Sequence, residues 1–269
     1  MQIGIVGTGL IGASIGMSLK SQGFVVSGCD SSAEHLEIAL RRNAIDFATS
    51  LSDIAKLDLI FICVSPSLIV PISQEAYALK APGSVFTDCG STKNEIALWA
   101  ADKPQFVPGH PMAGHEKSGP SFATNWLFRG AKWILTPGKK TDKEALALVD
   151  EFVRKMDAIP VKLSPESHDR QVGILSHLPH VLAGLLIESR KSIPSGDISG
   201  GSWKDLTRVA GVDPKLWADI MISNRAELSD ILSSFVANMG VVQGLLEAND
   251  RAGLEKWLRE IAAAKERQK

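Results

Sequence analysis

The first part of the chain alternates short apolar runs with stretches in which apolar residues recur at helical spacing. Apolar runs of this length are typical of buried strands, and the stretches between them are typical of helices packed on a sheet. Strands that alternate with helices predict βαβ units and a mostly parallel sheet. We expect strands at 3–6, 25–30, 45–48, 57–64, 84–88, 132–136 and 158–163, and helices at 10–22, 33–42 and 142–157.

Strand-like runs then give way to long amphipathic patterns. Pro165 and Pro214 suit the first position of a helix, where a missing N–H costs nothing. The glycine-rich segment 196–202 predicts a flexible break between helices. We therefore expect an α/β domain over residues 1–163 and an all-helical domain over residues 164–269. The expected helices of the second domain are 165–191, 214–247 and 250–265.

The composition narrows the class of protein. The chain has 269 residues and a formal net charge of -1, so neither charge sign favours nucleic acid or an anionic membrane as a partner. Three cysteines without paired spacing argue against a disulfide framework and against a zinc site. The N-terminus lacks a signal-peptide pattern, and no stretch approaches the ~20 apolar residues of a membrane span. We expect a cytoplasmic protein with neither nucleic acid nor membrane as a partner.

A glycine-rich motif follows the first predicted strand and opens the first predicted helix. In this context the first glycine permits a tight turn, the second lets the backbone approach a pyrophosphate, and the third lets the helix pack closely on the strand. The helix N-terminus then offers N–H groups and a partial positive charge to the phosphates. The motif predicts a dinucleotide site, and the alternative is a glycine-rich turn without a ligand. Its residues, in the pattern G-x-G-x-x-G, are Gly7, Thr8, Gly9, Leu10, Ile11 and Gly12.

A carboxylate at the end of the second predicted strand indicates which dinucleotide binds. Asp30 can accept hydrogen bonds from both hydroxyls of the adenosine ribose, and it repels a 2′-phosphate. No arginine follows it, so NAD is favoured over NADP. The alternative is that Asp30 serves only as a turn or helix-capping residue.

The end of the 57–64 strand is a second expected part of the cofactor site. Ligands of open parallel sheets lie beyond the carboxyl ends of the strands, so we expect Val64, Ser65 and Pro66 to contact the cofactor. An ordinary strand-to-helix turn is the alternative for these three residues.

Two segments of the α/β domain are candidates for chemistry. Ser91 follows a strand and precedes a helix, near where the nicotinamide should lie, although it could be only an N-cap. Glycine and proline frame His110, which is typical of a shaped loop, and histidine can accept a proton near neutral pH, as the oxidation of an alcohol requires. A surface or capping role is the alternative for His110. We take His115, which lacks such framing, as structural.

The helical domain supplies further candidates. His177 and His180 are three residues apart and share a helix face, and Pro179 between them could kink the helix. Two imidazoles without an acidic partner do not complete a metal site, so we expect no metal. Arg208 follows a glycine-rich segment and could hold a substrate carboxylate bidentately. A solvated helix charge, or a pair with Asp205, is the alternative for Arg208.

Together these segments resemble the prephenate/arogenate dehydrogenase family of tyrosine biosynthesis. The resemblance covers nearly the whole chain, and it rests on the order and spacing of the motifs more than on any one of them. It implies an NAD-binding Rossmann-like domain followed by a helical domain that dimerises, and therefore a homodimer. The motifs are G-x-G-x-x-G and residues 88–93, 110–114, 176–180 and 205–208.

The resemblance also implies roles for individual residues. His110 would bind the C4 hydroxyl of the substrate ring and accept its proton as hydride leaves C4 for NAD, with Ser91 beside that hydroxyl and the nicotinamide. Arg208 would bind a substrate carboxylate, and His180 together with His177 would line the pocket. Loss of the ring carboxylate as CO2 then gives an aromatic ring, so the enzyme mainly orients the substrate and places the base. Trp203 would either wall this pocket or belong to the core.

The choice of substrate depends on a single group. Prephenate carries a keto group where arogenate carries an ammonium, and a carboxylate near that atom would favour arogenate. The sequence does not place Glu116 relative to it. The second histidine of His-Leu-Pro-His, His180, resembles that of prephenate-using members, so prephenate is the expected substrate, with arogenate or both as alternatives.

Two other classes of protein compete with this interpretation. A β-hydroxyacid dehydrogenase would need a catalytic lysine in the helical domain, where this chain offers His177 and His180. A non-catalytic NAD-sensing or regulatory module would not need Ser91, His110 and Arg208 together.

Overall fold

The computed structural model describes residues 1–115, 117–193 and 198–267. Contacts divide the chain into two compact units, Met1–Arg225 and Ala226–Lys269. The helices that follow residue 163 belong, as far as Arg225, to the same compact unit as the sheet. The domain boundary expected at residue 163 therefore stays a prediction.

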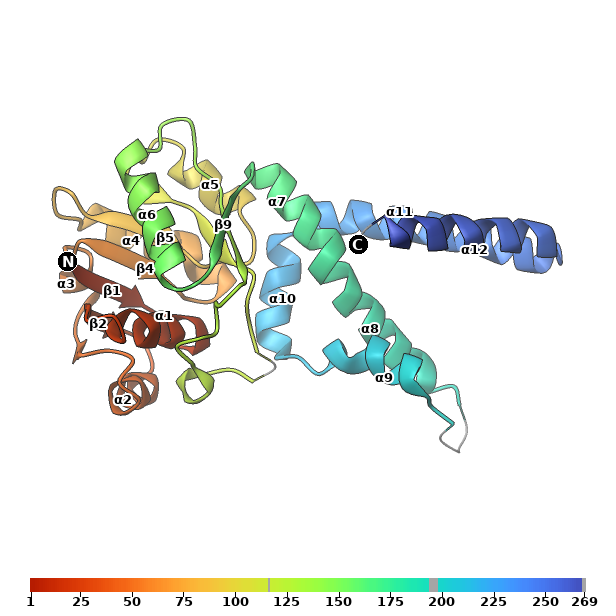
Figure 1. The fold of residues 1–269 in the computed structure, drawn as a ribbon, viewed down its shortest axis with the longest axis horizontal. Coiled ribbons are helices and arrows are strands. Elements are labelled where there is room, and N and C mark those ends of the chain that lie inside the picture. The colour runs from red at the N-terminus through yellow and green to blue at the C-terminus, as the bar shows by residue number, and fades with distance from the viewer. Residues whose placement is uncertain (116, 194–197, 268–269) are drawn as a thin grey trace. The chain divides into compact units, whose positions relative to one another are not determined.

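A parallel sheet of six strands forms the centre of the first unit (Figure 1). Its order is β3-β2-β1-β4-β5-β6. The chain builds outward from β1 to β3, then crosses back to β4 and builds outward on the other side, so the strand order switches between β1 and β4. A ligand of such a sheet lies at this switch point, beyond the carboxyl ends of the strands. The strands are β1 (Gln2–Val6), β2 (Val25–Cys29), β3 (Phe47–Ala48), β4 (Leu59–Ile62), β5 (Val85–Asp88) and β6 (Phe106–Val107).

Helices cover both faces of this sheet, which is why β4 is buried at every position. Phe61 packs into the apolar cluster on one face, whereas Ile60 and Ile62 pack into the cluster on the other. The expected α/β architecture is confirmed, although the helices at 51–54, 69–78 and 94–100 were not among those expected. The helices are α1 (Leu10–Lys20), α2 (Ala33–Arg41), α3 (Leu51–Ile54), α4 (Ile69–Ala78), α5 (Asn94–Ala100) and α6 (Lys143–Lys155), with 3-10 turns η1 (Pro66–Leu68) and η2 (Pro120–Phe122).

A second, three-stranded sheet extends the first unit. β7 (Gly109–Pro111) runs antiparallel to β8 (Lys132–Leu135), which pairs in parallel with β9 (Ile159–Lys162). His110 lies opposite Ile134 in this ladder. Its expected position on a loop is therefore wrong. Strand β7 has only three residues, and two of them are a glycine and a proline. Such a short segment cannot show the alternation of apolar and polar residues by which a strand is predicted.

The remaining helices of the first unit begin after β9. Ser164 caps the first of them by accepting a hydrogen bond from the Ser167 amide. A π-helical turn ends two residues before Pro179, whose ring nitrogen has no N–H to donate and whose ring would crowd a regular turn. Part of the expected break at 196–202, residues 196 and 197, lies outside the described residues. The elements are α7 (Pro165–Val172), the π turn η3 (Gly173–His177), α8 (Leu178–Arg190), α9 (Gly201–Thr207), the 3-10 turn η4 (Arg208–Ala210) and α10 (Pro214–Ser223).

The continuous helix Pro165–Arg190 is long and apolar enough, by length and composition alone, to cross a membrane. The expectation that no segment approaches this length and apolarity is wrong for it. Core helices pass the same test, and this helix carries His168, Asp169 and His177, which are all buried within the first unit. These three side chains belong to the site described below.

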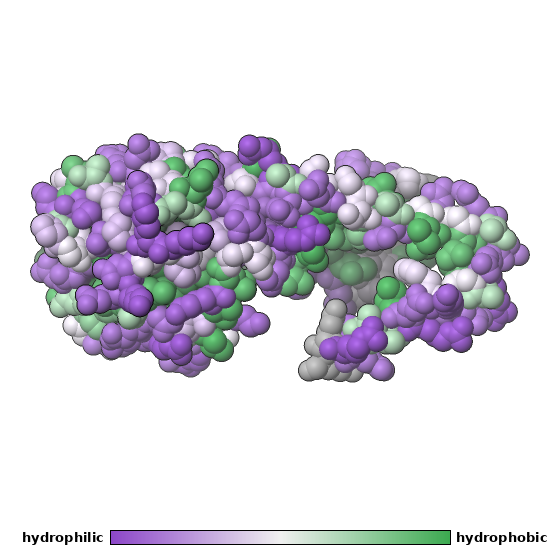
Figure 2. Space-filling model, turned by 90° about the horizontal axis from the view of Figure 1, so that it is seen from above, coloured by the Kyte–Doolittle hydropathy of each residue, from purple (hydrophilic) through white to green (hydrophobic). Residues whose placement is uncertain are grey.

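The second unit contains α11, which starts at the last residue of the first unit (Arg225–Glu247), and α12 (Arg251–Glu266). The helix expected over 214–247 is thus two helices, because it breaks at Asn224, the C-cap of α10. Asp250 caps α12 by accepting a hydrogen bond from the Gly253 amide. Figure 2 shows apolar side chains among the polar ones on these two helices. The large exposed apolar residues are Val236, Met239, Val241, Leu246, Leu258 and Ile261.

Candidate active site

The glycine-rich loop between β1 and α1 has the geometry that a dinucleotide requires. Gly7 has a φ of +91°, and a β-carbon there would lie 2.6 Å from the carbonyl oxygen of Cys63. A β-carbon on Gly12 would collide with the carbonyl of Gly7, whereas a β-carbon on Gly9 would meet nothing within 4 Å. The outer glycines are therefore required by the fold, and the middle one leaves open space over the start of α1.

The first turn of α1 keeps its N–H groups available. Gly9 occupies the N-cap position and offers no side chain to accept from them. By contrast, Ser32 and Ser50 cap α2 and α3 with their side chains. Free amides at a helix N-terminus, next to open space, fit the phosphates of a dinucleotide.

The carboxylate of Asp30 ties this loop to the end of β2. Its Oδ2 accepts hydrogen bonds from the amide of Thr8 at 2.7 Å and from the Thr8 hydroxyl at 3.1 Å, and its Oδ1 accepts from the Ser32 amide at 2.9 Å. Asp30 thus does serve in the turn, while Ser32 provides the helix cap. The Nδ1 of His35 lies 3.6 Å from Oδ2. The side chain of Asp30 remains 11% exposed, so part of it can still meet a ribose.

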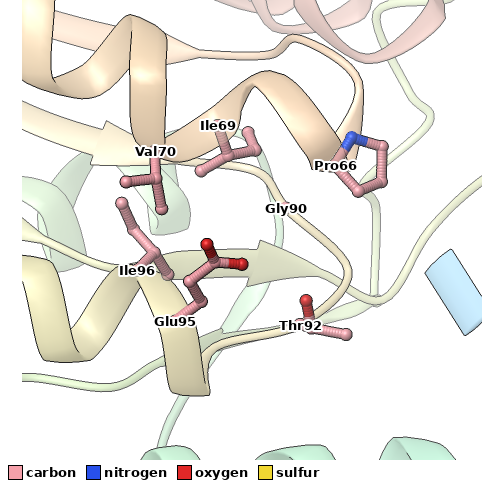
Figure 3. Close-up of a pocket in the computed structure, with 7 residues that line it drawn as sticks. All are labelled: Pro66, Ile69, Val70, Gly90, Thr92, Glu95 and Ile96. Atoms are coloured by element: carbon pink, nitrogen blue, oxygen red, sulfur yellow. The ribbon is translucent and has the colours of Figure 1, made fainter. Parts of the chain in front are cut away.

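The loops after β4 and β5 lie side by side and enclose a small pocket (Figure 3). Of the three residues expected to contact the cofactor here, Pro66 lines the pocket, Val64 is partly buried and Ser65 is exposed. The hydroxyl of Ser67 donates to Asp219 at 2.7 Å, which joins this loop to α10. The pocket residues are Pro66, Ile69, Val70, Gly90, Thr92, Glu95 and Ile96.

Ser91 is not the N-cap of the helix that follows it. The N-cap position of α5 belongs to Lys93, whose side chain makes no cap. Asp169, from α7, caps this helix across the fold by accepting from the amides of Lys93 at 2.7 Å and Asn94 at 2.8 Å. Ser91, partly exposed, is therefore left with a hydroxyl that α5 does not use.

A fully buried ion pair fixes the loop that carries Ser91 and the strand that carries His110. The ammonium of Lys93 contacts Oδ2 of Asp88, and both side chains have no exposed surface. Asp88 also accepts from the amides of Gly90 at 2.8 Å and Gly109 at 3.1 Å. One carboxylate thus holds the residue before Ser91 and the residue before His110.

His110 projects from β7 toward α7. Its Nδ1 lies 2.8 Å from Nε2 of His168, and Nδ1 of His168 lies 2.7 Å from Oδ1 of Asp169. Burial holds the pKa of His110 well below its usual 6.5, and repulsion of its protonated ring by His168 and His177, when these are protonated, and by the ammonium of Lys93 lowers it further. A neutral imidazole at physiological pH is the form that can accept a proton.

The two histidines predicted in the helical region, His177 and His180, lie beside this network. The side-chain amide of Asn224 donates to the carbonyl of Asp169 at 2.9 Å and lies 3.1 Å from Nδ1 of His177. Burial lowers the pKa of His177 to about 4. The ring of His180 stacks on Trp217 with centroids 3.5 Å apart, and its Nδ1 lies 2.8 Å from the carbonyl oxygen of Ser176.

Arg208 and Trp203 have a different environment. Arg208 is exposed in the 3-10 turn η4, which packs against α8, and within the described part of the chain it forms no ion pair with Asp205. Trp203 is partly buried, with the guanidinium of Arg190 5.8 Å from its ring centroid. Glu116 lies outside the described residues. The structure thus links His110 to His177 by hydrogen bonds through His168, Asp169 and Asn224. His177 and His180 both contact the ring of Trp217.

The sequence analysis named Asp88 and Lys93 only as the ends of a motif, without a role. It did not select four further residues of the site: His168, Asp169, Trp217 and Asn224. The adjacent His168 and Asp169, in the first turns of a helix with a buried face, were the one available signal. Within residues 1–115, 117–193 and 198–267, no three His, Cys, Asp or Glu side chains are arranged to hold a metal ion.

Family models cover most of the chain. The model for the nucleotide-binding domain of prephenate dehydrogenase matches residues 15–162, and the model for its dimerization domain matches residues 164–260. The chain belongs to the prephenate dehydrogenase family. Both the family and the Rossmann-like and helical architecture expected from the sequence are confirmed.

Relatives and solved structures agree with this membership. The prephenate dehydrogenase of Bacillus subtilis is 31% identical over 95% of this chain and 72% of its own length. A structure of Aquifex aeolicus prephenate dehydrogenase with hydroxyphenyl propionate and NAD+ has a TM-score of 0.91 at 29% identity, covering 100% of this chain and 98% of that one. Synechocystis arogenate dehydrogenase has a TM-score of 0.84 at 29% identity, and both chains are covered completely.

Proposed function

We propose that this chain uses NAD to oxidise prephenate with loss of CO2, giving 4-hydroxyphenylpyruvate for tyrosine biosynthesis. Family membership makes it an NAD-dependent dehydrogenase of the prephenate/arogenate class. The observation that carries the proposal is the neutral His110, held by His168 and set beside the loop of Ser91 through the shared contacts of Asp88.

The glycine-rich loop, the free amides of α1 and Asp30 would hold NAD, which supplies the hydride acceptor when bound. Asp30 would face the ribose hydroxyls and disfavour a 2′-phosphate. Its hydrogen bonds to Thr8 keep the loop next to β2, so the same carboxylate would shape the site and read the ribose.

His110 would accept the proton of the C4 hydroxyl as the C4 hydrogen leaves as hydride. Ser91, whose hydroxyl is not needed by α5, would hydrogen-bond to the same oxygen. Arg208, exposed and without an ion pair to Asp205 in the described chain, would be available to bind a substrate carboxylate. Departure of CO2 from the ring then leaves the electron pair that makes the ring aromatic.

His180 and Trp217 would bind the side chain of the substrate, with His177 behind them and Trp203 as a candidate wall. The contacts that hold His180 are a carbonyl and an indole, neither of which carries a charge. The uncharged surroundings that these two contacts give His180 suit the keto group of prephenate better than the ammonium of arogenate.

One observation favours arogenate as a second candidate substrate. Since Nδ1 of His180 donates to the carbonyl of Ser176, a neutral ring presents the lone pair of Nε2. Burial lowers the pKa of His180, so this neutral form dominates at physiological pH. A lone pair accepts from an ammonium, whereas a keto group requires a donor.

The match of residues 164–260 to a dimerization domain, together with the exposed apolar residues of α11 and α12, supports a homodimer. The cytoplasmic location and the absence of nucleic-acid or membrane partners stay predictions.

Purified chain mixed with NAD or NADP and with either prephenate or arogenate tests the function. We expect NADH absorbance to rise with prephenate, and chromatography to identify 4-hydroxyphenylpyruvate. Tyrosine formed faster from arogenate would select the second candidate. Absence of turnover with both substrates would reject the assignment.

A further inference from the structure

We propose that His168 and Asp169 are positioning residues that hold His110 in one tautomer, with hydrogen on Nδ1 and a lone pair on Nε2. The inference rests on the proposed function, in which His110 is the base. Two residues of α7 would thus orient the base, His110, which lies on β7. The three side chains form one chain of hydrogen bonds from Asp169 through His168 to His110.

The donor and acceptor of each of these hydrogen bonds can be assigned by starting from the carboxylate of Asp169. Oδ1 of Asp169 accepts from the amide of Lys93, and Oδ2 accepts from the amide of Asn94. Both oxygens thus present lone pairs to N–H donors. Nδ1 of His168, 2.7 Å from Oδ1, must therefore carry a hydrogen and donate it.

The same reasoning passes through the ring of His168. With Nδ1 protonated, the neutral ring has a lone pair on Nε2. The Nδ1 of His110 lies 2.8 Å away, so it must be the donor in that contact. A neutral His110 then has its lone pair on Nε2, the nitrogen that is left to meet the substrate hydroxyl.

Burial makes this arrangement hard to reverse. His168 is 1% exposed and Asp169 is not exposed, so water does not compete for their hydrogen bonds. Asp169 is anchored at both ends, because its carboxylate caps α5 and its carbonyl accepts from Asn224. Among the described residues, the other ionisable groups that act on the charge of His110 are His177, whose pKa is lowered to about 4, and Lys93, which is paired with Asp88.

Two substitutions of His168 separate tautomer control from packing. In His168→Gln the amide oxygen can accept from Nδ1 of His110 while the amide N–H donates to Asp169, so the pattern of donor and acceptor is kept. In His168→Leu a side chain of similar bulk offers neither. Asp46→Asn serves as a control for general destabilisation, because Asp46 accepts from Lys20 and from the amide of Val26 away from His110.

The first readout is kinetic. We expect His168→Leu to lower kcat by roughly 10²–10⁴-fold, as losing a correctly oriented base does, with Kd for NAD unchanged. His168→Gln should retain kcat within about tenfold, and Asp46→Asn should leave kcat unchanged. If His168→Leu retains kcat within the range of the Asp46→Asn control, or if the Gln and Leu variants lose kcat equally, the positioning role is wrong.

The second readout needs no turnover, so it separates failure of this inference from failure of the proposed function. Nitrogen-15 NMR of the imidazoles, with the His110 signals assigned by their loss in His110→Asn, distinguishes protonated from unprotonated ring nitrogens. We expect Nδ1 of His110 to be protonated in the wild type and in His168→Gln, and a mixture of tautomers in His168→Leu. The opposite tautomer in the wild type, or no change in His168→Leu, would overturn the inference.

Discussion

Nδ1 of His110 lies 2.8 Å from Nε2 of His168, and the two rings meet edge to face with their centroids 5.1 Å apart. His110 comes from the short strand β7 of the second sheet, and His168 comes from α7. The proposed base therefore depends on a residue that the chain reaches only after α6 and β9 have been added to the fold.

The pH dependence of catalysis should show how strongly the site perturbs His110. Burial, and then repulsion of the protonated ring by His168 and His177, when these are protonated, and by the ammonium of Lys93, hold the pKa of His110 well below 6.5. Only the neutral ring can accept a proton, so protonation at low pH removes activity. We expect kcat/KM to stay level from about pH 8 down to the ordinary histidine range and to fall only below it. An acid limb centred at or above pH 6.5 would contradict the assignment.

The fold was largely predictable because its signals are local. Apolar runs located the strands other than β6 and β7, and Gly7, Gly9 and Gly12 each act within a single turn between β1 and α1. The site was only partly predictable, because its contacts join distant segments. Nothing in the sequence around Lys93 indicates that its amide is capped by Asp169 or that its ammonium is buried against Asp88.

Replacing Asp30 should change the choice of cofactor. We expect Asp30→Ser to weaken NAD binding by roughly 10- to 100-fold, the range for losing hydrogen bonds to a charged group. The difference in kcat/KM between NAD and NADP should therefore become smaller. Thr8 also loses its partner, so binding of both cofactors should fall in part. Steady-state kinetics with NAD and with NADP measure the ratio of the two kcat/KM values. Asp53→Ser, at an exposed carboxylate that accepts from Ser50, is the control. If the preference for NAD over NADP changes no more in Asp30→Ser than in the control, Asp30 does not read the ribose.

The buried pair of Lys93 and Asp88 should contribute strongly to stability. Lys93→Met leaves a buried carboxylate without its counter-charge, which typically costs about 3–5 kcal/mol. We expect a loss of this size in the free energy of unfolding measured by urea titration. Lys191→Met, which breaks an exposed pair with Glu188, should change it little. Equal effects of the two substitutions would mean that the buried pair adds nothing beyond a surface pair.

Arg208 is the candidate for holding a substrate carboxylate. Arg208→Ala should raise KM for the substrate by roughly 10- to 100-fold, as the loss of a charged hydrogen bond does, with a smaller effect on kcat. Arg154→Ala, which removes an exposed arginine paired with Asp150 on α6, is the matched control. Steady-state kinetics with saturating NAD measure both. An unchanged KM for Arg208→Ala would reject its role.

Turnover by His110→Asn tests the central claim most directly. Asparagine can still donate to Nε2 of His168, so the network is kept while the base is removed. With NAD binding verified by fluorescence titration, we expect kcat to fall by roughly 10²–10⁴-fold. A variant that binds NAD and oxidises the substrate within a few-fold of the wild-type rate would contradict the identification of His110 as the base.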